Sequence, residues 1–141
     1  MSGLSYDDLV ENFAYLDDWE ERYRYVIELG KALTPLDDAR KNDANKVDGC
    51  VSRVWIDSRA VEETGATRIE FDGDSDAHIV RGLIAILHVM LSGRPAREIV
   101  GMDVAAQLQR LDLADHLSPQ RSNGLGAMVE RIKGVAAAQA G

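Results

Sequence analysis

The fold is decided by residues 51–72, which read VSRVWIDSRAVEETGATRIEFD. Side chains in residues 51–58 alternate between two faces, and residues 66–72 continue with apolar positions at every second residue. This period of two predicts two β-strands. A short charged segment containing Gly65 separates them, so they should pair as an antiparallel hairpin. One predicted face carries Ser52, Val54 and Ile56.

Two helices are predicted before this hairpin. The first begins at Ser5, which is followed by acidic residues that favour a first helical turn. The second begins after Asp17 or Asp18, shows apolar residues at three- and four-residue steps, and is ended by Pro35. Residues 36–49 are polar and without period. Such a long loop in a compact domain is typically mobile or functional.

The acidic residues 72–76 are predicted to form an exposed turn after the second strand. Ser75 or Asp76 is the expected N-cap of the next helix. That helix, residues 77–91, is apolar on nearly every side, which is typical of a buried central helix. It is too short and too interrupted by charge to span a membrane.

The remaining chain predicts further helices and completes the fold class. Short helices are expected at about 95–100 and 104–108, and a last helix from Ser118, with a frayed tail at 136–141. Residues 1–141 therefore predict one α+β domain, with its core at about 5–135 and a small antiparallel sheet covered by helices.

Charge and cysteine content exclude several classes of function. A net charge of −8 argues against binding nucleic acid or anionic membranes, and is compatible with a basic protein partner. The single cysteine excludes an internal disulfide and any multi-cysteine metal site within one chain. The acidic N-terminus does not resemble a signal peptide, so a cytoplasmic protein is expected.

That cysteine, Cys50, lies between the polar loop and the first predicted strand. Gly49 before it permits a turn forbidden to other residues and a close approach of another molecule. Cys50 is either a small buried hydrophobe, as free cysteine often is, or a thiol presented as a nucleophile. A position at the end of the apolar pattern, and not inside it, favours the second interpretation.

Self-contained catalysis has little support in the sequence. A Cys–His hydrolase needs a base, but His78, His88 and His116 stand in no recognisable pairing pattern with Cys50. His88 is expected to be a satisfied core residue and His116 to be exposed. The acidic turn lacks the spacing of a calcium loop. A last residue, Arg121, is either a solvated charge or an anchor for loop carbonyls or a thiolate.

Several motifs in order resemble the family of SufE-like (SufE/CsdE) sulfur acceptors. Residues 49–55 resemble its G-C-x-S-x-V-W signature, and residues 19–30 its second helix. Residues 73–85 are similar to its turn and central helix, and residues 117–125 to its closing motif. These blocks keep the family order across residues 13 to 133, which makes the resemblance far more specific than one motif.

The resemblance implies a sulfur carrier and not an enzyme. Cys50 would take persulfide sulfur from a cysteine desulfurase (SufS/CsdA-like), stimulate that enzyme, and pass the sulfur to an iron–sulfur scaffold complex (SufBCD-like). Pyridoxal phosphate would belong to the desulfurase, and the carrier would need no metal or cofactor. The implied fold is that of the iron–sulfur scaffold proteins (IscU-like), as a monomer or weak homodimer. The alternative is a stand-alone cysteine hydrolase or thiol peroxidase.

The same resemblance implies a set of site residues around a flexible loop that shelters Cys50 until a partner docks. Asp74 and Arg121 are expected near the loop, to tune its resting position and docking. The residues expected to bind the partner or position the loop are Gly49, Val51, Ser52, Asp74, Ser75, Asp76 and Arg121.

Overall fold

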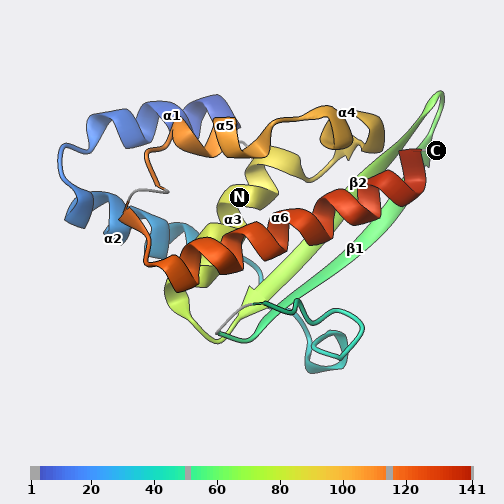
Figure 1. Cartoon of the computed structure of the whole chain (residues 1–141), viewed down its shortest axis with the longest axis horizontal. Coiled ribbons are helices and arrows are strands. Elements are labelled where there is room, and N and C mark those ends of the chain that lie inside the picture. Colours follow the sequence, from blue (N-terminus) through green and yellow to red (C-terminus); the bar gives the residue numbers. More distant parts are fainter. Residues whose placement is uncertain (1–3, 50–51, 114–115, 141) are drawn as a thin grey trace.

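A long antiparallel ribbon forms the centre of the sheet in the computed structural model, which describes residues 4–49, 52–113 and 116–140 (Figure 1). Strands β1 (Val54–Glu63) and β2 (Ala66–Ser75) pair along their whole length. Gly65 has φ of +81°, a backbone conformation that glycine adopts without strain in such a tight turn. The predicted hairpin is confirmed, and both strands are longer than expected.

Helices cover the ribbon, and the predicted α+β single-domain architecture is confirmed. A short strand adds to β2, so that the sheet order is β1-β2-β3. The other elements are α1 (Tyr6–Tyr15), α2 (Trp19–Lys31), η1 (Asp38–Arg40), α3 (His78–Leu91), β3 (Arg94–Pro95), α4 (Ala96–Gly101), α5 (Val104–Gln109) and α6 (Pro119–Ala140). Figure 1 shows α6 running along the ribbon, with its C-terminal end near the hairpin tip. The expected likeness to iron–sulfur scaffold proteins stays a prediction.

Most helix ends follow the sequence signals. Ser5 caps α1 in a capping box with Asp8, and Asp18 caps α2 by accepting a hydrogen bond from the backbone of Glu21. Helix α2 ends at Lys31, before the predicted stop at Pro35. The expected fraying from Ala136 is wrong for the residues up to Ala140, because α6 continues there and Ala136 is fully buried.

The predicted turn at residues 72–76 is wrong. Asp72 to Ser75 end β2, where Asp72 pairs with Asp57 and Ser75 with Val54. Gly73 suits this strand because a Cβ there would lie 2.7 Å from a methyl group of Ile84 in α3. Burial against α3 and charge pairing thus override the turn-like composition.

Helices α2 and α3 cross at two glycines. A Cβ at Gly82 would lie 2.1 Å from the carbonyl oxygen of Val26, and one at Gly30 would lie 2.6 Å from the backbone nitrogen of Gly82. The two backbones therefore approach more closely than any side chain would allow. Within the part of the chain that is described, no helix is long and apolar enough to cross a membrane.

Replacing Gly82 by alanine should lower the free energy of unfolding by about 3 kcal/mol, because the new methyl group forces the helices apart. Gly134→Ala in α6 is the control, since a Cβ there meets nothing within 4 Å. It should raise stability by about 0.5 kcal/mol through the lower entropy of the unfolded chain. Urea denaturation checks both, and a Gly82→Ala protein as stable as the wild type would contradict the close crossing.

Residues 36–49, here called the strap, are packed against the sheet. Val47 is 4% exposed, and its N–H donates to the carbonyl of Val54 at 2.9 Å. The N–H of Ile56 donates to the carbonyl of Asn45 at 2.8 Å. The strap thereby pairs with the outer edge of β1, which an edge strand otherwise leaves open. The predicted loop is thus tied to the sheet at Asn45 and Val47.

Arg40 also fixes the strap to the ribbon. Its guanidinium donates to Asp57 on β1 at 2.6 Å and to Asp72 on β2 at 3.0 Å. Burial alone would raise the pKa of Asp72, but hydrogen bonds from Arg40 and Arg59 outweigh it and lower that pKa. Hydrogen bonds to the same two carboxylates raise the pKa of Arg40. The strap is therefore held by charge as well as by backbone pairing.

Candidate functional site

Two residues that flank Cys50 in the sequence, Gly49 and Ser52, are both described. Cys50 and Val51 themselves lie outside the described residues, so the expectations placed on them remain predictions. Gly49 has φ of +91°, the left-handed conformation that its lack of a side chain allows. A Cβ on Gly49 would lie 3.4 Å from the Cβ of Ala127 in α6. The strap therefore reaches α6 at this end.

Ser52 lines a cavity of about 130 Å³, here called the Arg121 cavity. Polar groups come from Ser52 and from the first turns of α6, and apolar groups come from β1, α3 and α6. The lining is formed by Ser52, Val54, Val80, Ser118, Gln120, Arg121, Gly124, Leu125 and Met128. The cavity thus lies where the chain follows residues 50–51, here called the Cys50 segment. Its lining includes one cationic residue, Arg121.

Arg121 takes its place in this cavity from the start of α6. Ser118 precedes the helix, and its hydroxyl accepts a hydrogen bond from the N–H of Arg121 at 3.2 Å. The side chain of Arg121 is half-buried, so it is not a fully solvated charge. Arg121 lines the cavity together with Ser52. Its action on a thiolate stays a prediction.

Asp74 is buried, in contrast to the exposed turn residue that the sequence predicted. Its side chain is 2% exposed and forms an ion pair with Arg81 of α3. It also accepts from the N–H of Leu36 at 3.0 Å and lies 3.5 Å from the ammonium of Lys41. Asp74 therefore contacts the first part of the strap, whereas Arg121 lies beside Ser52.

Ser75 and Asp76 hold the chain on the other side of the Cys50 segment. The hydroxyl of Ser75 donates to the carbonyl of Arg53 at 2.7 Å, and Asp76 accepts from the N–H of Arg53 at 3.1 Å. The N-cap of α3 is Ala77. The expectation that Ser75 or Asp76 caps this helix is therefore wrong. The oxygens of Ser75 and Asp76 bind Arg53, and the Ser75 hydroxyl also accepts a hydrogen bond from the N–H of Ala77 at 3.2 Å.

Arg81 is the residue that the sequence analysis missed. Besides the ion pair with Asp74, its guanidinium donates to the carbonyl of Gly30 at 3.3 Å and to that of Leu33 at 2.8 Å. It thus binds carbonyls at and just beyond the C-terminal end of α2, the region where a helix leaves carbonyls without intrahelical partners. An arginine inside an almost wholly apolar helix was the available signal, because a charge at such a position needs a partner.

The histidines do not gather at the cavity. His88 is half-buried against the ring of Phe71, and burial lowers its pKa. His116 is exposed and stacks on Trp19 with 4.4 Å between ring centres. Within the described ranges, the cavity lining includes no histidine and no cluster of His, Cys, Asp or Glu has the geometry of a metal site.

Comparison with known proteins now identifies the family. A family model described as "SufE: Fe-S metabolism associated domain" matches residues 7–136. The chain belongs to the SufE family. The family connects this SufE-like chain with iron–sulfur metabolism, and the prediction made from the ordered motifs is confirmed.

Curated relatives share most of the length of this SufE-family chain. An uncharacterised SufE-like protein of Rhizobium etli is 49% identical over 129 residues, which cover 92% of this chain and 87% of that protein. One of Rhizobium meliloti is 46% identical, with 92% of each chain covered. The solution structure of a hypothetical protein from Thermus thermophilus has a TM-score of 0.72 at 18% identity, over 95% of this chain and 94% of that one. This last likeness shows the fold.

Asp74→Asn should lower the free energy of unfolding by about 3 kcal/mol, because it leaves the guanidinium of Arg81 without its carboxylate. Asp43→Asn is the matched control, since Asp43 is exposed in the strap and the same charge is lost. Its stability should stay within about 0.5 kcal/mol of the wild type. Equal unfolding midpoints for Asp74→Asn and Asp43→Asn in urea would refute a stabilising role for the buried pair.

Proposed function

We propose that the protein is a sulfur acceptor that takes persulfide sulfur from a cysteine desulfurase onto Cys50 and stimulates that enzyme. The sulfur would then pass to an iron–sulfur scaffold complex. SufE family membership supports a place in iron–sulfur metabolism. The observation that supports the finer proposal is that the residues before and after the Cys50 segment both lie near α6: Gly49 approaches Ala127 of this helix, and Ser52 lines the Arg121 cavity.

The transfer is an exchange at sulfur. The Cys50 thiolate attacks the outer sulfur of the desulfurase persulfide and forms a new S–S bond. The S–S bond of the desulfurase breaks, and its cysteine leaves as a thiolate. One sulfur atom changes carrier with no net oxidation or reduction, so the step needs no cofactor on the carrier. Pyridoxal phosphate serves the desulfurase in releasing sulfur from free cysteine.

The surroundings of the Cys50 segment suit this exchange. A guanidinium close to a thiol favours the thiolate, and the lining of the cavity that contains Ser52 includes Arg121. The strap and the Ser75–Asp76 pair fix the chain on both sides of Cys50, through Val47 and Arg53. We infer that only a short segment changes conformation when a desulfurase docks, while its two ends stay attached.

Incubation with a purified SufS-type desulfurase and free cysteine should raise the intact mass of the protein by one sulfur atom. The added mass should disappear on reduction, because a persulfide is reducible. Peptide mapping after alkylation should place it on Cys50. The wild-type protein should also raise the rate at which the desulfurase releases alanine.

Cys50→Ser is the control for this experiment, since it removes only the sulfur nucleophile. It should gain no mass and should not stimulate the desulfurase by the covalent route. Full stimulation by Cys50→Ser would show that no covalent relay takes place. Turnover of a peroxide or an ester by the purified protein alone would instead favour the stand-alone cysteine enzyme.

A further inference from the structure

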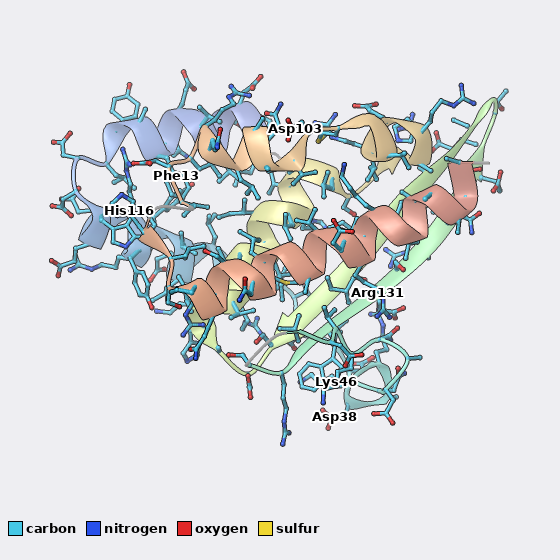
Figure 2. The ribbon with its side chains drawn as sticks, in the orientation of Figure 1. Phe13, Asp38, Lys46, Asp103, His116 and Arg131 are labelled. Carbon is cyan, nitrogen blue, oxygen red and sulfur yellow. The ribbon has the colours of Figure 1, made fainter. Side chains whose placement is uncertain are left out.

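Arg131 joins the strap to α6. From the middle of α6, its guanidinium donates to the carbonyl of Lys46 at 3.2 Å and to that of Ala44. Figure 2 shows Arg131 directed from the helix toward the strap, where Lys46 is labelled. Two backbone carbonyls of the strap thus accept hydrogen bonds from one planar guanidinium group, which only arginine among the cationic side chains provides.

The strap runs antiparallel to α6. Arg131 contacts Lys46, Ala127 faces Gly49, and Arg121 lines the cavity with Ser52. Residue numbers therefore rise along the strap in the direction in which they fall along α6. Residues three and four apart share a helix face, so Arg131 lies one turn beyond Ala127. The position of the strap along α6 therefore sets where Gly49, the residue before Cys50, lies on that helix.

Backbone pairing with β1 attaches the strap to the sheet and not to α6. It holds Asn45 and Val47 to the sheet, and Arg40 holds the strap to the same ribbon. Among the described residues, the side-chain hydrogen bonds that join the strap to α6 come from Arg131. Without them the strap keeps its attachment to the sheet and loses this polar attachment to the helix that carries Arg121.

We propose that Arg131 is a positioning residue for sulfur transfer, which holds the strap in place along α6 and so fixes the position of Gly49, the residue that precedes Cys50. This inference rests on the proposed function. Arg131 touches neither sulfur nor substrate in this role; it acts through the carbonyls of Ala44 and Lys46. Its loss reduces the fraction of molecules whose strap is in the competent position.

The test compares Arg131→Ala and Arg131→Lys with Arg97→Ala. Lysine keeps the positive charge but lacks the planar guanidinium that binds both carbonyls. Arg97→Ala removes the same charge from an exposed position of α4, away from the strap. Two quantities are measured: the rate at which iodoacetamide alkylates Cys50 in the free protein, and the carrier concentration that gives half-maximal stimulation of a purified SufS-type desulfurase.

Arg131→Ala should raise the half-stimulating concentration about tenfold and leave the maximal rate within about twofold, because a smaller competent fraction weakens apparent affinity. The alkylation rate of Cys50 should rise about fivefold, as the loosened strap exposes the thiol more often. Both values for Arg131→Lys should lie between those of Arg131→Ala and the wild type. Both values for Arg97→Ala should equal those of the wild type.

A wild-type value for either quantity in Arg131→Ala would overturn the proposal, as would an equal change in Arg97→Ala. A purely structural role would lower the urea midpoint while the alkylation rate in native buffer stays unchanged. Should Arg131→Ala not fold, Arg131→Lys decides by the same two values. Should the wild type accept no sulfur, the proposed function fails, and the alkylation rate alone still tests whether Arg131 positions the strap.

Discussion

The ion pair between Asp74 and Arg81 joins four parts of the chain at one buried point. Asp74 ends β2 and accepts the N–H of Leu36, while Arg81 in α3 donates to the carbonyls of Gly30 and Leu33 at the end of α2. A buried charge is tolerated only when it is paired and hydrogen-bonded. The positions of the sheet, the central helix, the end of α2 and the start of the strap therefore depend on each other.

From that point the strap carries the chain to the functional segment. Its first residues lie beside Asp74, its middle pairs with the edge of β1, and its end reaches α6 at Gly49. Under the proposed function the protein presents its sulfur to two partners in turn, which a rigid support on both sides of Cys50 would serve. The strap and α6 supply such a support without a large core of their own.

The sequence predicted much of the fold because the decisive signals are local. Alternation around Val54 and Ile56 indicated the strand, and Ser5 and Asp18 marked helix starts through their own capping oxygens. The residues 72–76 were misjudged for the opposite reason. Their composition is that of a turn, and only the partners Arg81 and Ile84, from α3, make a strand of them.

By itself, the sequence determined the order of the elements, the family and the single thiol that the proposed chemistry uses. The period of the apolar residues and the ordered motifs indicate these directly, since each is a pattern of neighbouring residues in the sequence. Tertiary structure alone decided that Asp74 is buried and that Arg121 faces a cavity beside Ser52. It also decided that Arg131 holds the strap. The partners of Arg131 are backbone carbonyls 85 and 87 residues away, and a carbonyl has no sequence signature.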